Sequence, residues 1–302
     1  MFLNKYAPIR TAVSRQRYLL IVVIAAITCL MIISSLQKHL GLSDHALFEF
    51  HKPSVSRNNA YALFFNESET LLGGKPEESL EYIQIRMLVW QLLHDPQTRT
   101  RNYHVVVLVP SHVSEAKRDR LRLDGAIVKP LQDHTGAILE ASPLLPLLHV
   151  FNFVEYEKVA ILAADTWLTR PMDAIFEDSA TQSFAVTDVV DSGRTMRLTR
   201  PKIYTFAATT SAQTHDHSYP LVHLEGNATF GCIVVGPSRE SFTYYTSVAA
   251  MQYYPSEETL WNDVHAADGS MPMKYFNSSW HIDWPTYNDF RSGIASLRTE
   301  SW

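Results

Sequence analysis

The sequence predicts an α/β domain with a mixed, mostly parallel sheet and flanking helices, preceded by one N-terminal transmembrane helix. Short apolar runs rich in β-branched residues alternate with helix-length segments, which is the pattern of open α/β sheets. The clearest strand is His104 to Val109, HVVVLV, and Val159 to Leu162 has the composition of a strand buried on both faces. Residues 18–37 form an uncharged run that is long enough to cross a bilayer.

The N-terminal region carries the signals of a membrane anchor. The formal net charge of −5 divides into +4 on residues 1–17 and −9 on the rest. Because positive residues precede the span, we expect a cytosolic tail at 1–17, a signal anchor at 18–37 and a stem at 38–58. A cleaved secretory signal is the alternative, because the small residues Ser34-Ser35 close the apolar run.

This orientation predicts a single-pass type II membrane protein whose residues 59–302 form one domain in the lumen of the Golgi or another secretory compartment. Asn66, Asn227 and Asn277 begin sequons for N-glycosylation. One of the two cysteines, Cys29, lies inside the span, so no disulfide can form within the lumenal domain. The acidic balance gives no indication of a nucleic-acid partner.

The first half of the domain reads as alternating strands and helices. Ser114 can cap a helix that Gly125 ends, since glycine favours the left-handed conformation there. The other expected elements are a strand at Tyr61–Phe65, a helix at Glu77–His94 with apolar residues at helical spacing, a strand at Ala126–Val128 and a helix at Leu144–Phe153.

The second half continues the pattern with one long interruption. Strands are expected at Phe184–Val189 and Phe230–Val235, and helices begin at Pro237 and Glu257. Residues 191–218 are polar and rich in Arg, Thr and Ser, so we expect a mobile loop there.

The stretch 156–176 carries the candidate chemistry. Its strand stops at Ala163-Ala164-Asp165-Thr166, which puts a carboxylate at the carboxyl end of a buried strand, where open α/β sheets place ligands. Arg170-Pro171 then breaks the chain before a helical turn. From these residues alone, Asp165 is either a ligand-binding acid or a cap of the following turn.

The same stretch, YEKVAILAADTWLTRPMDAIF, resembles the YDRVLYLDADTLVLRPLDELF signature of glycosyltransferase family 8, the glycogenin-like enzymes, and the membrane-anchored fungal members in particular. GCIVVGPSRESF, PSEETLWNDVH and MPMKYFNSSWHIDWPT are similar to later segments of that family. The resemblance covers residues 59–302. It implies a GT-A fold and transfer of a sugar, with retention, from a nucleotide-diphosphate sugar to a glycan or protein acceptor.

The resemblance also implies a Mn²⁺ cofactor, since a divalent ion neutralises the leaving diphosphate. Asp165 matches the second acid of the family's Asp-x-Asp motif and is the implied metal residue, while Ala163 stands at the first acid and no histidine after His281 can serve as the further ligand. No catalytic residue is assigned. The implied donor-binding residues are Asp165, Thr166, Asp188, Thr229, Gly231 and Glu258.

These departures leave three interpretations open. Asp165 can still hold a divalent ion together with substrate phosphates, because such ions often use only one or two carboxylates. Arginines can instead bind the diphosphate without metal, the candidates being Arg170, Arg194, Arg197 and Arg200. Or the chain is a catalytically inactive carbohydrate-binding or partner subunit of the lumen.

Overall fold

The computed structural model describes residues 58–65, 79–131, 145–187, 198–210, 217 and 228–298. All of them belong to the unit Ser54–Trp302. The predicted cytosolic tail and membrane span, and all of the predicted stem except residue 58, lie outside this part of the chain. Within the described residues, no helix has the length and apolar character needed to cross a membrane.

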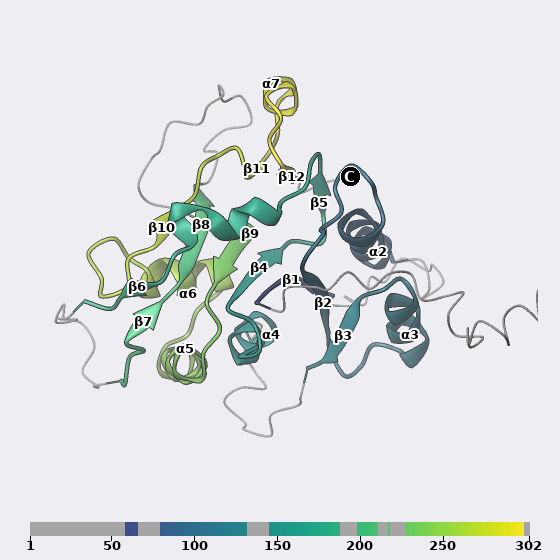
Figure 1. Ribbon diagram of the computed structural model, residues 1–302. Coiled ribbons are helices and arrows are strands. Elements are labelled where there is room, and N and C mark those ends of the chain that lie inside the picture. Colours follow the sequence, from purple (N-terminus) through teal and green to yellow (C-terminus); the bar gives the residue numbers. More distant parts are fainter. Residues whose placement is uncertain are drawn as a thin grey trace, which may run out of the picture. The chain divides into compact units, whose positions relative to one another are not determined.

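A seven-stranded sheet in the order β10-β8-β9-β4-β1-β2-β3 forms the centre of the domain (Figure 1). Strand β1 pairs in parallel with β2 and β4, and β2 with β3. Strand β9 runs antiparallel to β4 and β8, while β10 is parallel to β8. This confirms the expected mixed, mostly parallel sheet. The strands are β1 Asn59–Phe64, β2 His104–Val109, β3 Ile127–Pro130, β4 Lys158–Leu162, β8 Phe206–Thr210, β9 Ala228–Val235 and β10 Lys274–Tyr275.

Helices cover both faces of this sheet. Strand residues alternate between the faces, so Ala60 and Ala62 of β1 join one core cluster while Tyr61 and Leu63 join the other. The first cluster packs under α4 (Leu145–Leu148), the 3₁₀ turn η2 (His149–Asn152), α5 (Arg239–Met251) and α6 (Glu257–Val264). The second packs under α2 (Leu80–Leu93), α3 (Glu115–Leu123) and the 3₁₀ turn η3 (Asp173–Glu177).

Two small sheets complete the described fold. In the first, β12 (Ser296–Arg298) lies between β11 (His281–Asp283), to which it is parallel, and β5 (Thr166–Leu168), to which it is antiparallel. The second pairs β6 (Phe184–Ala185) with β7 (Ile203–Tyr204). The remaining elements are the 3₁₀ turn η4 (Ser179–Thr181) and helix α7 (Tyr287–Arg291).

Local sequence signals explain several boundaries. The Ser114 hydroxyl accepts a hydrogen bond from the Lys117 amide at the start of α3, and Gly125 follows that helix with φ +100°, as expected. Ser238 caps α5 and Ser256 caps α6 in the same way. These caps satisfy amide donors that the first turn of a helix leaves without partners.

The expected loop over residues 191–218 is wrong in part. Strands β7 and β8 lie within it, and β8 is an interior strand of the central sheet. Its sequence, FAATT, consists mostly of small and polar residues, and Ala207 and Ala208 are fully buried between neighbouring strands. The strand expected at 184–189 is described only as the two-residue β6, and residues 188–189 lie outside the described part. The helix expected at 144–153 divides into α4 and η2.

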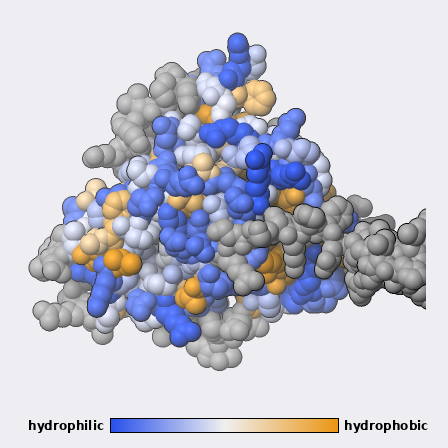
Figure 2. Space-filling view, in the orientation of Figure 1, coloured by the Kyte–Doolittle hydropathy of each residue, from blue (hydrophilic) through white to orange (hydrophobic). Residues whose placement is uncertain are grey.

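The helix expected at 77–94 is confirmed as α2, but its buried face differs from the apolar stripe in the sequence. Leu80, Ile83, Met87 and Trp90 are 45–55% exposed. The side chains that α2 buries against the sheet are Tyr82, Ile85, Leu88, Val89, Gln91 and Leu92. The space-filling view is mainly hydrophilic on the face that it shows, with hydrophobic residues in small groups (Figure 2).

Candidate functional site

The candidate site lies where the strand order of the sheet changes direction. Strand β1 has β2 on one side and β4 on the other, so the chain leaves β1 toward opposite edges. Ligands of open α/β sheets bind outside the carboxyl ends of the strands at such a point. Asp165 follows the end of β4 by three residues and precedes β5, which places it at this edge.

The Asp165 carboxylate is held by an arginine. The Arg298 Nε–H donates to Asp165 Oδ1 at 3.0 Å and to Oδ2 at 3.2 Å. The side chains of Asp165 and Arg298 are 19% and 21% exposed, so this ion pair is partly shielded from water. The structure therefore gives Asp165 a protein cation as its partner.

Strand register explains why Arg298 reaches Asp165 across 133 residues of sequence. In the β11-β12-β5 sheet, Arg298 lies opposite Asp283 of β11 on one side and opposite Thr166 of β5 on the other. Asp165 is the residue before Thr166. The Arg298 side chain therefore lies between two carboxylates, with its terminal nitrogen Nη1 3.8 Å from Asp283 Oδ1.

His281 extends this arrangement into the core. It is fully buried; its Nε2 lies 3.1 Å from Asp283 Oδ1 and its Nδ1 lies 2.7 Å from the Ser296 hydroxyl. We call Asp165, Arg298, Asp283 and His281 the ionic cluster. It is assembled from the turn after β4 and from strands β11 and β12, which lie beside β5 in Figure 1.

Hydrogen-bond directions place a proton on Nδ1 of His281. The Ser296 hydroxyl donates to the Trp280 carbonyl at 2.8 Å, so it accepts from His281 Nδ1–H. The other ring nitrogen, Nε2, faces the Asp283 carboxylate.

Gly231 of β9, an implied donor-binding residue, has a clear structural role. A Cβ at this position would lie 1.8 Å from His281 Nε2 and 2.6 Å from Asp283 Oδ1. Any side chain here would displace the histidine and its carboxylate partner. Cys232, the next residue, is fully buried, and burial together with the Asp283 charge raises the pKa of its thiol, which keeps it protonated and unreactive.

Other predicted site residues are brought together only in part. Thr166 is buried at the start of β5, and its hydroxyl has no hydrogen-bond partner among the described residues. The backbone of Thr229 pairs with Thr209 near the end of β8, on the same edge of the sheet as Asp165. Glu258 is exposed in the first turn of α6, away from the ionic cluster's residues. Asp188 lies outside the described residues.

The predicted glycosylation sequons are also described only in part. Asn66 and Asn227 lie outside the described residues. Asn277 is exposed, and its Oδ1 accepts a hydrogen bond from the Ser279 amide within the sequon. Its side chain is therefore accessible to a modifying enzyme.

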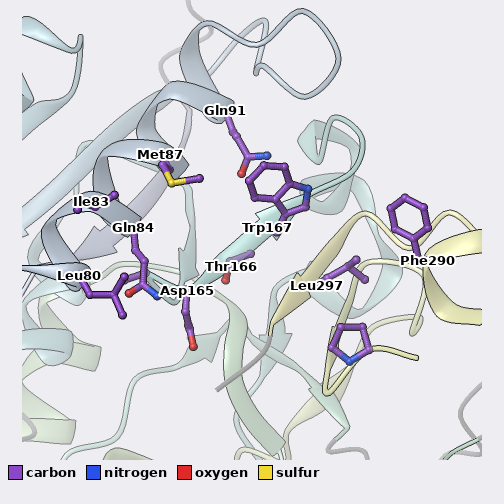
Figure 3. A pocket seen from close by; sticks show the side chains of 12 residues that line it. Leu80, Ile83, Gln84, Met87, Gln91, Asp165, Thr166, Trp167, Phe290 and Leu297 are labelled. Carbon is purple, nitrogen blue, oxygen red and sulfur yellow. The ribbon is translucent and has the colours of Figure 1, made fainter. Parts of the chain in front are cut away.

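A cavity of about 610 Å³ opens beside Asp165 (Figure 3). Leu80, Ile83 and Met87 of α2 form one wall. Gln91 ties α2 to β5, since its amide bonds both the N–H and the carbonyl of Leu168 at 3.2 Å. The volume is that of a small-molecule site with a polar end. The remaining lining residues are Gln84, Ala164, Asp165, Thr166, Trp167, Pro285, Phe290 and Leu297.

The described residues do not fit the implied Mn²⁺ ion. Ala163 supplies no carboxylate, Asp165 is paired with Arg298, and His281 uses both ring nitrogens within the protein. Within the described ranges, no group of three or more His, Cys, Asp or Glu side chains is arranged to hold a metal ion.

The sequence suggested four arginines that could bind the diphosphate, but the arginine beside Asp165 is a different one, Arg298. Arg170 donates to the carbonyls of Gly293 and Ser279 at 3.0 and 3.1 Å and its guanidinium lies over the Trp280 ring, so it fixes the segment before β11 and the turn before β12. Arg194 and Arg197 lie outside the described residues, and Arg200 does not line the cavity. Arg298 was missed, because its strand β12 is only three residues long and shows no periodicity in the sequence.

Comparisons with known proteins find one partial relative in sequence and several distant structural neighbours. No family model matches it. An uncharacterised protein of Schizosaccharomyces pombe is 34% identical over 113 residues, which is 33% of this chain and 30% of that relative's length. The similar solved structures include the galactosyltransferase LgtC bound to donor and acceptor sugar analogues (12% identity, 80% of this chain and 87% of that chain, TM-score 0.43). Mouse xyloside xylosyltransferase 1 (10% identity, 80% and 98%, TM-score 0.42) and the bifunctional glycosyltransferase WbbM (13% identity, 83% and 47%, TM-score 0.47) are also similar.

Proposed function

We propose that this protein binds a nucleotide-diphosphate sugar at the carboxyl edge of its sheet and transfers the sugar to a glycan or protein acceptor. The observation that carries the proposal is the Asp165–Arg298 pair beside the end of β4, at the point where the strand order changes direction. A guanidinium at this edge is suited to phosphate oxygens, which it binds with directed, charge-assisted hydrogen bonds.

The order of motifs supports a transferase of the family 8 type, with a GT-A fold and retention at the anomeric carbon. The stretch around Asp165, the β9 segment with Gly231 and the segment leading into β11 follow the family's order in the sequence. In the structure these three segments meet around the ionic cluster. Segments that resemble the family's donor site thus lie together in space.

The cavity beside Asp165 is our candidate for the acceptor. It adjoins the proposed donor site through Asp165 and Thr166, and the exposed Trp167 ring forms part of its wall. An acceptor bound there would have its polar end next to the donor.

The test is release of nucleoside diphosphate by the purified full-length protein from a panel of UDP- and GDP-sugars, with a mixture of glycan acceptors. We expect release from at least one donor, and an α-linked product by NMR if the donor is α-linked. A protein that neither binds nor turns over any member of the panel would contradict the proposal.

The second candidate function is a catalytically silent subunit that binds carbohydrate or a partner. Ala163 at the place of the first acid, together with Asp165 being occupied by Arg298, favours it. Donor binding without product in the same assay, across all acceptors, would favour this candidate over the transferase.

We also propose that the protein is a type II membrane glycoprotein of the Golgi or another secretory compartment, anchored through residues 18–37. The uncharged span, the positive residues before it and the exposed Asn277 support this. Endoglycosidase treatment of the expressed protein should increase its gel mobility, and Asn277→Gln should remove part of that shift. An unchanged mobility would contradict a lumenal domain.

A further inference from the structure

We propose that Arg298 takes the place of the divalent ion, so that the donor diphosphate binds to its guanidinium without metal. This inference rests on the proposed function and names the group that would recognise the donor. It also assigns a ligand-binding role to a residue that the sequence resemblance did not identify.

Arg298 has N–H donors that the described residues leave unused. A guanidinium has five N–H donors, and only Nε–H is used, for Asp165. The terminal nitrogens make no hydrogen bond to any of the described residues, and the contact of Nη1 with Asp283 at 3.8 Å is an ion pair without one. With 21% of the side chain exposed, these donors can reach phosphate oxygens.

The guanidinium of Arg298 is also held in a fixed orientation. Asp165 contacts Nε through both of its oxygens, which fixes one edge of the planar guanidinium. Asp283, 4% exposed, lies beside Nη1 on the other side. The guanidinium is therefore held between two carboxylates before a ligand arrives, which lowers the entropy cost of binding.

The third observation is the balance of charges around Arg298. In the metal-dependent arrangement that the resemblance implies, the two positive charges of Mn²⁺ balance two acids. In this chain Arg298 supplies a positive charge between Asp165 and Asp283. The guanidinium therefore offsets negative charge at this edge without a metal ion, which reduces the repulsion of a diphosphate.

The experiment is calorimetric titration of the full-length protein with UDP-glucose and with GDP-mannose, in EDTA and again in Mn²⁺. We expect at least one probe to bind with a dissociation constant that changes less than threefold between the two conditions. Arg298→Ala should weaken that binding tenfold or more in EDTA, and Arg298→Lys should weaken it less, since lysine keeps the charge but not the fork.

The matched control is Arg86→Ala. Arg86 also pairs with an aspartate through Nε, Asp124 at 2.6 Å, and is partly exposed, but it lies on α2 away from the ionic cluster. Its removal should leave donor affinity unchanged. Melting curves of all three variants identify any that fail to fold, and Arg298→Lys is the test if Arg298→Ala does so.

The outcomes separate this inference from the proposed function. Binding that requires Mn²⁺, or binding in EDTA that Arg298→Ala leaves unchanged, would overturn the inference and leave the proposed function standing. Absence of binding by both probes in both conditions would overturn the inference, and absence of binding across the whole donor panel would overturn the proposed function as well.

Discussion

His265 and His281 are both buried, but they lie in regions of opposite electrostatic character. His265 stacks on Phe206 with a ring-centroid distance of 3.8 Å, receives a hydrogen bond from the Tyr245 hydroxyl at Nε2 and donates from Nδ1 to the Met271 carbonyl. Burial lowers the pKa of His265 to about 3, so the ring is neutral. His281 has a carboxylate at Nε2 instead of a hydroxyl.

The comparison shows that the partners of the two ring nitrogens set the surroundings of a buried histidine. In the aromatic core of Phe206, Tyr245 and Trp261, none of the described carboxylates hydrogen-bonds His265, and the neutral ring packs like an aromatic side chain. In the ionic cluster, Asp165 and Asp283 flank Arg298, and Asp283 also faces His281. The first region stabilises the fold by packing, and the second holds charges at the edge where ligands bind.

The largest expected effect comes from removing the carboxylate that His281 and Arg298 share. Asp283→Ala takes a buried carboxylate away from the Arg298 guanidinium and from His281 Nε2, and we expect a loss of about 3–5 kcal/mol in unfolding free energy by denaturant titration. Asp119→Ala is the control, because it removes a surface pair with Arg122 and should leave the midpoint unchanged. Equal losses for the two variants would show that the ionic cluster carries no special stability.

A larger residue at Gly231, beside His281, should lower the unfolding free energy somewhat less than Asp283→Ala does. Gly231→Ala places a Cβ 1.8 Å from His281 Nε2, and we expect a loss of about 3 kcal/mol in unfolding free energy because a neighbouring strand must shift. Gly293→Ala, at φ +74° with open space around the new Cβ, should lose only about 1 kcal/mol from backbone strain. A Gly231 variant as stable as the Gly293 variant would mean that His281 is not held as described.

The neutral histidine predicts a pH dependence. The pKa of His265 in the folded chain, about 3, lies below the ordinary value of about 6.5, so unfolding takes up a proton between these pH values and stability falls as the pH is lowered. Between pH 7 and pH 5 this amounts to about 2 kcal/mol. His265→Gln should lack this part of the loss in denaturant titrations at the two pH values. An identical loss in wild type and variant would mean that His265 is charged in the folded state.

The smallest expected loss of stability comes from removing the Tyr245 hydroxyl, which hydrogen-bonds the His265 ring. Tyr245→Phe removes the hydroxyl that donates to His265 Nε2 at 2.9 Å, and leaving this nitrogen without a donor should cost about 1–2 kcal/mol. The same substitution at Tyr253, which is 83% exposed, is the control and should have no effect on the denaturation midpoint. A cost no larger than that of the control would contradict the assigned hydrogen bond.

The sequence was sufficient for the elements with strong hydrophobic runs. The β-branched runs of β2 and β4 and the capping serine of α3 indicated those elements within a few residues, and their alternation indicated the mostly parallel sheet. Strand β8 was missed because Ala207 and Ala208 at its centre have neither the size nor the branching of typical strand residues. Its burial comes from its neighbours in the sheet and not from its own pattern.

Of the Asp165–Arg298 pair, only Asp165 could be predicted from the sequence. Asp165 stands beside a buried strand and could be identified from its position, whereas Arg298 lies 133 residues away in a three-residue strand with no periodicity to detect. Only the register of β11, β12 and β5 brings Asp283, Arg298 and Thr166 into one row. The proton on His281 Nδ1 follows from the hydroxyl of Ser296, which no local pattern reveals.

The most direct test of the central claim, that Arg298 fills the cation position, is Mn²⁺ binding followed by electron paramagnetic resonance of the free ion. Full-length wild type and Asp165→Asn are titrated side by side without nucleotide. The ionic cluster predicts the same free-ion signal for both proteins, because Asp165 is already neutralised by Arg298. Binding of one Mn²⁺ by the wild type that Asp165→Asn abolishes would contradict it.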